Sequence, residues 1–271
     1  MLRPNLILVG SDRGGVGKTT TARALVEYFE IMNIDVKAYD SQSPLGNLYR
    51  YHRHLVEVID IEDTRDQCRL LEDMNFPGRV TILDLCAGSF AFTLKFLEEV
   101  GVFAAAASGR LNLVVLHLVG RSRASKAEME VVKPFLGACD YRVVRNLTAN
   151  SAVVTGDPLK GSGLKVSQNH APQIVIPQLD AIAFEAVELS GASFTSFVLD
   201  QDHDGKSSRR SFVLRGYVKT WLEQVWDNFE AAGINNLIAV RNQKKIASAQ
   251  NHKHHNKKQR GDQGNERFQA R

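Results

Sequence analysis

The residues of this sequence best suited to chemistry follow its first apolar run, where a glycine-rich segment ends in a lysine and two threonines. The segment reads Gly10-Ser11-Asp12-Arg13-Gly14-Gly15-Val16-Gly17-Lys18-Thr19-Thr20. Glycines allow consecutive backbone N–H groups to turn inward around phosphate oxygens, because no Cβ obstructs the turn. A helix that opens at the lysine points the positive end of its dipole at the same anion. The sequence therefore predicts a loop that binds the phosphates of a nucleotide through Gly14, Gly15, Val16, Gly17, Lys18, Thr19 and Thr20.

Two side chains of this loop have specific tasks in the prediction. Lys18 would bridge the β- and γ-phosphates, and the Thr19 hydroxyl would be a ligand of Mg²⁺. The usual pattern has a glycine five residues before Gly17, and here that position is Asp12. The strict motif therefore fails by one residue. A glycine-rich turn without a ligand is the alternative, but the succession of strand, loop and helix favours nucleotide binding.

The residues around the loop alternate apolar, β-rich runs with segments of helical period. The apolar runs occupy 6–9, 36–39, 80–85, 111–119, 141–144 and 174–176, and the helical segments occupy 19–31, 90–100 and 125–136. Nearly continuous apolar strands separated by helices are typical of a parallel sheet covered on both faces. We therefore predict an α/β fold, a doubly wound, mostly parallel sheet with helices on both faces, over residues 1–235. We also expect an edge strand within 55–61, a helix over 64–74, a long polar loop over 146–172 and an amphipathic helix from 211 to about 231.

The overall composition excludes several classes of protein. Of 271 residues, 44% are hydrophobic and 24% are charged, which is ordinary for a globular protein and excludes collagen-like or fully disordered chains. Three scattered cysteines (Cys68, Cys86 and Cys139) fit neither a disulfide framework nor a four-ligand zinc site. No run approaches the roughly 18 apolar residues of a membrane helix, and the first residues lack the pattern of a signal peptide. We therefore expect a cytoplasmic protein.

The last part of the chain differs from the rest in charge. Residues 241–271 contain nine Lys or Arg and two acidic residues, a net charge of +7, whereas the whole chain carries +4 and residues 1–240 therefore carry −3. This part is also poor in apolar residues, so it cannot bury enough surface to fold alone. We predict a basic, disordered tail over 236–271. The tail is either solubilising or an electrostatic anchor on nucleic acid.

The glycine-rich loop resembles the deviant phosphate loop of the ParA/MinD family of ATPases, whose pattern is Lys-Gly-Gly-Val-Gly-Lys-Thr-Thr. The resemblance spans Leu6 to about Gly191, and the loop is its specific part. It implies the P-loop NTPase fold, ATP and Mg²⁺ as cofactors, and a homodimer that forms around ATP. In the family the first lysine reaches the partner's phosphates, and the matching residue here is Arg13, whose forked guanidinium keeps the charge.

A second matching segment, Asp40-Ser41-Gln42, follows the second apolar run. Family members have Asp-x-Asp here, in the segment called switch I, so Asp40 matches and Gln42 replaces the aspartate that orients or activates water. Glutamine cannot act as a base, although it can position water. The resemblance therefore implies Arg13, Lys18, Asp40 and Gln42 as catalytic residues of a slow or partner-stimulated ATPase.

Three further positions match the family. The strand-like run Ile82-Leu83-Asp84-Leu85-Cys86-Ala87-Gly88 resembles its Walker B and switch II segment, in which Asp84 would hold Mg²⁺ and the N–H of Gly88 would approach the γ-phosphate. Asn146 ends a later strand where the family commonly has an asparagine that reads adenine, since a carboxamide can pair with both N6 and N7. Pro177 lies in a segment that passes next to the base in the family.

The resemblance implies an ATP-dependent dimer switch for DNA or plasmid partitioning or for positioning a cargo. The expected partners are a second copy of the chain, nonspecific DNA and a DNA-bound or cargo adaptor protein. Arg209, Arg210, Arg215, Lys219 and the tail are the candidate DNA contacts. The tail lacks the bulky apolar residues of the membrane helix in the MinD branch, so no membrane contact is expected. Two alternatives remain: a regulatory module that binds ATP without hydrolysing it, and a metabolic relative that phosphorylates or amidates a small molecule.

Overall fold

The computed structural model describes residues 3–119, 123–135, 137–147, 173–201 and 205–237. It contains one seven-stranded sheet of the order β3-β2-β4-β1-β5-β6-β7, in which every pair of neighbouring strands is parallel. The strands are β1 (Asn5–Gly10), β2 (Val36–Asp40), β3 (Val56–Val58), β4 (Val80–Asp84), β5 (Asn112–Leu118), β6 (Asp140–Asn146) and β7 (Ile174–Ile176). The predicted parallel sheet is confirmed, and the expected strand within 55–61 forms the edge strand β3.

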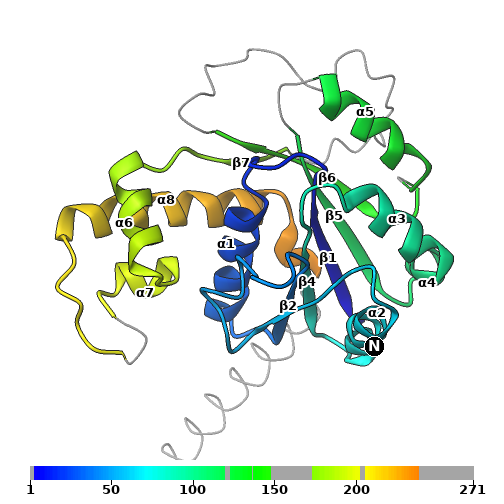
Figure 1. Cartoon of the computed structure of the whole chain (residues 1–271), viewed down its shortest axis with the longest axis horizontal. Helices are drawn as coiled ribbons and strands as arrows, with labels where there is room; N and C mark the ends of the chain where they lie inside the picture. Colours follow the sequence, from blue (N-terminus) through cyan, green and yellow to red (C-terminus); the bar gives the residue numbers. More distant parts are fainter. Residues whose placement is uncertain (1–2, 120–122, 136, 148–172, 202–204, 238–271) are drawn as a thin grey trace, which may run out of the picture.

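Eight α-helices surround the described part of the sheet (Figure 1). They are α1 (Lys18–Ile31), α2 (Thr64–Glu72), α3 (Phe90–Glu99), α4 (Val102–Ala107), α5 (Arg123–Val132), α6 (Ala181–Ser190), α7 (Phe194–Val198) and α8 (Phe212–Ala231). Short 3₁₀ turns follow at Asp73–Asn75, Lys133–Phe135 and Ile234–Leu237. The short helices α4 and α7 were not expected from the sequence, because neither is long enough to show a helical period.

The helices divide between the two faces of the sheet, as a doubly wound fold requires. One face of β1 presents Ile7 and Val9 to a core shared with α1, α6, α7 and α8, and the other presents Leu6 and Leu8 to a core shared with α2–α5. Figure 1 shows the two groups of helices on opposite sides of the strands. Since β1 is buried along its whole length, its unbroken apolar sequence is explained by burial on both faces.

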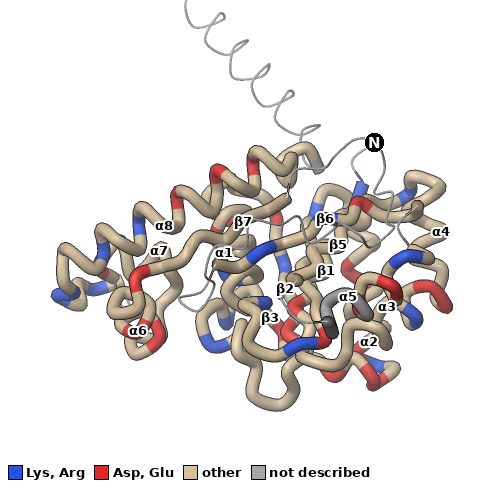
Figure 2. The backbone as a smooth tube through the Cα atoms, turned by 90° about the horizontal axis from the view of Figure 1, so that it is seen from above, with Lys and Arg blue, Asp and Glu red and all other residues tan. Residues whose placement is uncertain are grey.

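Helix α8 closes one side of the molecule and is fixed by its two tryptophans. Trp221 Nε1 donates to the carbonyl oxygen of Pro177 at 2.7 Å, and Trp226 Nε1 donates to that of Ala24 at 3.1 Å. Basic residues lie in the first half of α8 and acidic residues in the second half (Figure 2). Among the residues that the structure describes, no helix combines the length and the apolar character needed to cross a membrane.

The strand order brings the predicted site residues to one edge of the sheet. Asp40 and Asp84 end neighbouring strands and are paired in register, and Val9 of β1 is paired with Asp84 from the other side. Because the carboxyl ends of parallel strands meet at one edge, the glycine-rich loop after β1 and both aspartates face the same space.

Candidate functional site

Residues 11–17 connect β1 to α1 and leave the first turn of the helix open to a ligand. Gly17 precedes α1 in a left-handed conformation, with φ of 94°, and no side chain caps the helix. The first turn of α1 contains no acidic residue. The free N–H groups and the positive end of the helix dipole therefore remain available to an anion.

A cavity of about 550 Å³ lies beside this turn. It is lined by Gly14, Gly15, Gly17, Lys18, Thr19, Thr20, Asp40, Gln42, Asn47, Asp84, Leu85, Cys86 and Ala87. The structure thus brings together most of the residues predicted from the loop and from the ends of β2 and β4. Arg13, Val16, Gly88, Asn146 and Pro177 are not among the lining residues.

The ammonium group of Lys18 rests on the loop itself. Its Nζ donates to the carbonyl oxygen of Arg13 at 2.6 Å, and the residue is 8% exposed. Burial lowers the pKa of Lys18, although the negative charge of Asp84 acts in the opposite direction. A buried ammonium group whose hydrogen bond goes to a neutral carbonyl is suited to receive a phosphate oxygen in its place.

Asp84 carries a buried carboxylate oxygen that lacks a hydrogen-bond partner. The residue is 3% exposed, and its Oδ1 has no donor within reach. Burial raises the pKa of Asp84 to about 8, and the neighbouring charge of Asp40 contributes, whereas the hydrogen bond from Thr19 and the charge of Lys18 oppose the rise. A carboxylate and a hydroxyl at the phosphate end of such a cavity are the oxygen ligands that Mg²⁺ prefers. The donor set of Asp84 and Thr19 therefore fits a divalent cation.

Asp40 shapes the loop that follows β2. Its Oδ1 accepts the N–H of Gln42 at 2.9 Å, and its Oδ2 accepts the N–H groups of Leu48 and Tyr49 at 2.5 and 3.2 Å. Three backbone donors occupy the carboxylate, which is 1% exposed. The bond to Gln42 is that of an Asx turn, and the bonds to Leu48 and Tyr49 extend the same kind of contact to the end of the loop. Asp40 therefore holds the loop 41–49 in place.

Gln42 reaches the cavity together with a residue that sequence reasoning missed. Asn47 Nδ2 donates to Gln42 Oε1 at 2.5 Å, and both side chains line the cavity. The bond fixes the orientation of the Gln42 amide and leaves its NH₂ group free to donate. Asn47 lies five residues after Gln42 in the sequence, but only the fold of the loop brings its side chain back to Gln42.

Asp12 explains why the strict glycine pattern is broken. Its Oδ1 accepts the N–H of Phe90 at 2.9 Å, and its carbonyl oxygen accepts the N–H of Gly88 at 3.1 Å. A side chain is needed at this position because it satisfies the N-terminus of α3, whose own N-cap Ser89 makes no side-chain cap. The N–H of Gly88 thus points to the loop and not into the cavity.

Asn146 and Pro177 lie outside the residues that line the cavity, and Asn146 contacts the loop while Pro177 contacts α8. Asn146 Nδ2 donates to the carbonyl oxygen of Val16 at 3.1 Å, and a Cβ on Gly17 would overlap this same amide. The carbonyl oxygen of Pro177 accepts the indole N–H of Trp221. Both residues of the predicted base-binding region therefore hold other protein groups, and Arg13 is exposed at the edge of the loop.

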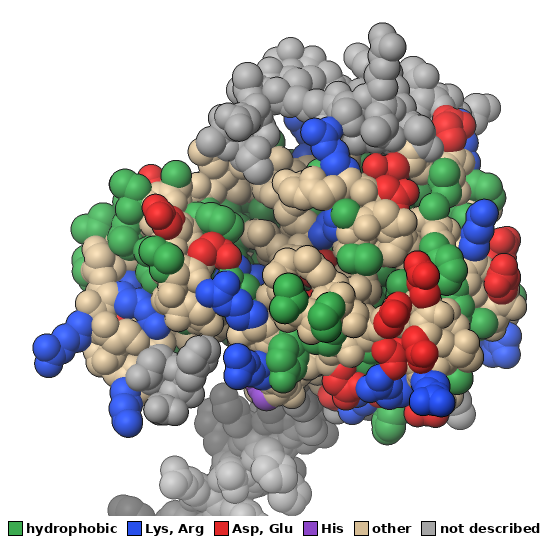
Figure 3. Space-filling view, viewed as in Figure 1, with side chains coloured by type: hydrophobic (Ala, Val, Ile, Leu, Met, Phe, Trp, Pro, Cys, Tyr) green, Lys and Arg blue, Asp and Glu red, His purple; other side chains and the backbone are tan. Residues whose placement is uncertain are grey.

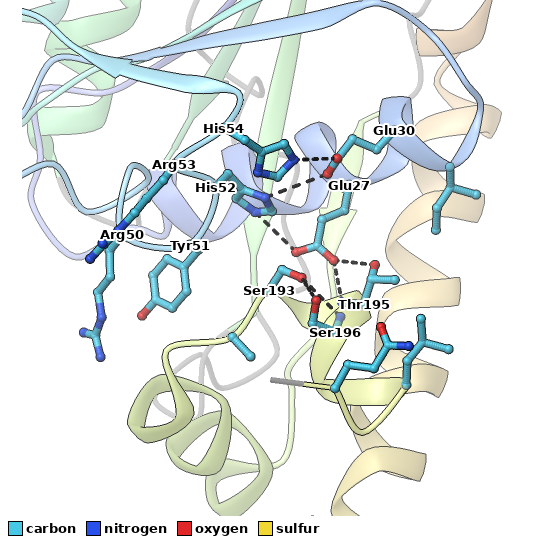
Figure 4. A pocket seen from close by; sticks show the side chains of 14 residues that line it. Glu27, Glu30, Arg50, Tyr51, His52, Arg53, His54, Ser193, Thr195 and Ser196 are labelled. Atoms are coloured by element: carbon cyan, nitrogen blue, oxygen red, sulfur yellow. Dashed lines mark hydrogen bonds and ion pairs between the residues drawn. The ribbon is translucent and has the colours of Figure 1, made fainter. Parts of the chain in front are cut away.

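A second cavity, of about 500 Å³, lies where the segment 50–54 meets α1 and α7 (Figure 4). The buried Glu27 accepts the N–H of Phe194 at 2.9 Å and both the N–H and the hydroxyl of Thr195 at 2.6 Å. His52 Nε2 lies 3.5 Å from Glu27 Oε1. Burial alone would raise the pKa of Glu27, but its bonds with His52 and Thr195 and the charge of Arg23 lower it. These contacts fasten the chain beyond the Asp40 loop to α1 and α7.

Comparisons with known proteins show similarity in structure only. No family model matches the chain, and no curated protein matches it. Among solved structures, the chain is similar to a nucleotide-binding protein in complex with ADP from Archaeoglobus fulgidus, with 15% identity over 68% of this chain and 85% of that chain and a TM-score of 0.41. It is also similar to the MinC:MinD cell division protein complex of Aquifex aeolicus, with 16% identity over 81% and 96% of the two chains and a TM-score of 0.43. The chain is also similar to a plasmid partition protein from Borrelia burgdorferi, with 11% identity over 85% of this chain and 100% of that chain and a TM-score of 0.38.

The chain has an α/β fold of the P-loop-like class. A parallel sheet, the glycine-rich loop between β1 and α1, and aspartates at the ends of β2 and β4 define this class. Because the identities and TM-scores of these similar structures are low, the class rests on the sheet and the loop.

Proposed function

We propose that the chain binds ATP with Mg²⁺ in the 550 Å³ cavity and works as a ParA/MinD-like switch. The observation that carries the proposal is the meeting of Lys18, the uncapped start of α1 and the unpartnered oxygen of Asp84 in one cavity. Each of these features lacks a charge or a partner that a nucleotide triphosphate with its cation supplies. Gly14, Gly15, Val16, Gly17 and Thr20 complete the proposed phosphate cradle.

We propose separate roles for the residues of the site in binding phosphate, holding the cation and orienting water. Lys18 exchanges the carbonyl of Arg13 for phosphate oxygens, while Asp84 and Thr19 hold the cation. Mg²⁺, when bound, neutralises the charge that develops on the phosphates. Gln42, held by Asn47, orients a water through its NH₂ group or through its remaining lone pair. Arg13 is exposed, and we propose that it reaches the nucleotide of a second copy.

We expect slow turnover, because no carboxylate that lines the cavity is free to act as a base. Asp40 is occupied by three backbone N–H groups, and Asp84 is assigned to the cation. The same observation favours the second candidate, a regulatory module that binds ATP without hydrolysing it. Gly88, Asn146 and Pro177 do not line the cavity, so we propose that the γ-phosphate and the base extend beyond it toward them.

Partner binding belongs to the same proposal. Helix α6 exposes Ile182 and Leu189, which are 66% and 79% exposed, at the end of the molecule where hydrophobic side chains gather (Figure 3). Such a surface suits a protein partner, either a second copy or an adaptor. With these partners, the switch would act in DNA or plasmid partitioning or in positioning a cargo.

Of the four candidate DNA contacts, Arg209 and Arg210 precede α8 and Arg215 and Lys219 lie within it. Three of the four have a polar contact within the protein, and that of Lys219 is an ion pair with Glu223 at 3.8 Å. Arg210 donates to the carbonyl oxygens of Ser196 and Gln201, and Arg215 donates to that of Val198. Arg209 and Lys219 are exposed. We propose residues 1–235 as the ATPase domain and 236–271 as a basic tail that binds nonspecific DNA in the cytoplasm; nearly all of the tail, like most of the expected loop over 146–172, lies outside the described residues.

The test is ATP binding by calorimetry, followed by steady-state turnover with Mg²⁺, with and without nonspecific double-stranded DNA. Lys18→Ala is the blank, and Lys95→Ala, an exposed lysine on α3, is the matched control. We expect the wild type and Lys95→Ala to bind ATP and Lys18→Ala to lose binding. Lys18-dependent turnover that DNA stimulates supports the switch, whereas binding without turnover in both conditions supports the regulatory module. A wild type that binds no nucleotide would refute both.

A further inference from the structure

A row of four buried polar side chains runs from β6 to the start of the phosphate loop. The Tyr141 hydroxyl lies 2.8 Å from His117 Nδ1, and His117 Nε2 lies 3.0 Å from Glu128 Oε2. The Ser11 hydroxyl donates to the same Glu128 oxygen at 3.0 Å. Their exposed fractions are 7% for Tyr141 and Glu128 and 0% for His117 and Ser11, so the row is shielded from water.

The apolar packing of this region does not need a carboxylate. Leu113, Val115, Val132 and Val143 already join β5, α5 and β6 in one core. A buried carboxylate costs stability unless hydrogen bonds compensate it. Burial alone would raise the pKa of Glu128, yet the hydrogen bonds from His117 and Ser11 lower it, so the group stays ionised. A backbone hydrogen bond from Asp12 reaches the same carboxylate.

The contacts of Ser11 continue to the centre of the site. The N–H of Arg13 donates to the Ser11 hydroxyl oxygen at 3.3 Å, and the carbonyl oxygen of Arg13 holds Lys18 Nζ at 2.6 Å. Glu128 therefore holds Ser11 and Asp12 on one side, and these residues set the peptide groups that fix the resting place of the Lys18 ammonium. This stretch, before the first loop glycine Gly14, is where the strict motif is broken.

We propose that Glu128 is a positioning residue of the phosphate loop, acting through Ser11 and held in its own place by His117 and Tyr141. Glu128 does not touch the nucleotide. It prepares the loop for the phosphate chain of a nucleotide by fixing the turn from which Lys18 is presented. The part of this proposal that concerns nucleotides rests on the proposed function, whereas the part that concerns the loop stands on contacts within the chain.

Two measurements test the ordering of the loop and the binding of nucleotide separately. Hydrogen exchange of the amides of residues 11–18 is measured without nucleotide, and the Kd for ADP with Mg²⁺ is measured by calorimetry. In Glu128→Gln, which keeps the shape and loses the charge, we expect faster exchange in the loop and an affinity about tenfold weaker, which corresponds to about 1.4 kcal/mol. Glu130→Gln, on the same helix but exposed, is the matched control and should change neither. Val225→Ala, a buried site on α8, should lower Tm without changing the Kd.

A double-mutant cycle tests the route through Ser11. If Glu128 acts through Ser11, then Ser11→Ala and Glu128→Gln each weaken binding about tenfold, and the double variant weakens it about tenfold and not about a hundredfold. Unchanged exchange in the loop of Glu128→Gln, or losses that multiply in the double variant, would overturn the positioning role. A wild type that fails to bind ADP, with faster loop exchange still present in Glu128→Gln, would refute the proposed function and uphold the positioning role.

Discussion

Replacing Gly17 by alanine should damage the phosphate loop more than the same change at Gly15. Both glycines have a positive φ, 94° at Gly17 and 72° at Gly15, so an alanine at either position carries a backbone strain of about 1 kcal/mol. They differ in what surrounds them. A Cβ at Gly15 meets no atom within 4 Å, whereas a Cβ at Gly17 overlaps the side-chain amide of Asn146.

The overlap sets the size of the difference. In Gly17→Ala the Asn146 side chain must move, and its hydrogen bond to the carbonyl oxygen of Val16 is lost. The loss of this hydrogen bond lowers the free energy of unfolding by about 1 kcal/mol in addition to the backbone strain. We therefore expect Gly15→Ala to lower the free energy of unfolding by about 1 kcal/mol and Gly17→Ala to lower it by about 2–3 kcal/mol. Urea unfolding without nucleotide, followed by the fluorescence of Trp221 and Trp226, measures both.

Removing the amide identifies the cause. Asn146→Ala alone should cost about 1 kcal/mol, and combined with Gly17→Ala it should cost little more than Gly17→Ala, because the overlap and the hydrogen bond disappear together. Combined with Gly15→Ala, its cost should simply add. Equal losses for Gly15→Ala and Gly17→Ala, or additive losses at Gly17 and Asn146, would refute the reasoning.

Three further predictions concern single side chains. Asp84→Asn should remove the gain in nucleotide affinity that Mg²⁺ gives the wild type, so that its calorimetric Kd is the same with Mg²⁺ and with EDTA; a Mg²⁺ effect that persists would exclude Asp84 as the ligand. Asp12→Ala should lower the free energy of unfolding by about 1 kcal/mol through loss of the cap on Phe90 N–H, while Asp12→Asn should retain most of it in the same urea experiment. The pKa of Glu27 is lowered in the folded chain, so its contribution is present above the ordinary value of 4.5 and is lost as the pH falls through the lowered pKa. The stability difference between the wild type and Glu27→Gln should therefore shrink as the pH falls below about 4.5, and a difference that grows in acid would contradict this sign.

The sheet and the loop were predictable because their signals are local. Each central strand is a short apolar run bounded by polar residues, and the glycines stand in sequence next to the lysine that they present. The position of Asp84 beside the loop is predicted by its place at the carboxyl end of a strand, whereas that of Asp40 is predicted by the resemblance to the ParA/MinD family. The strand expected within 55–61 forms as well, although β3 is only three residues long.

The functions of the side chains within the site depend on contacts between residues that are far apart in the sequence, which the sequence alone does not predict. Asp12 was read as a failed glycine, but its carboxylate caps a helix that begins 78 residues later in the chain. The role of Asn146 in reading adenine stays a prediction, and the structure adds a contact of its amide with a loop 130 residues earlier in the chain. Neither contact can be predicted from the spacing of residues in the sequence. Each contact depends on which strands become neighbours in the sheet and on how closely the loops that follow them approach.

These contacts also bear on how much the loop can tolerate change. A glycine in a phosphate loop is usually explained by the room that a phosphate needs, yet at Gly17 the space that a Cβ would take is filled by Asn146 from β6. The Gly17 position is thus constrained by the protein as well as by any ligand, whereas Gly15 is constrained by its backbone conformation alone. Loss of nucleotide binding in Gly17→Ala would therefore not by itself show that Gly17 touches phosphate, and the comparison with Gly15→Ala, which leaves the packing intact, separates the two causes.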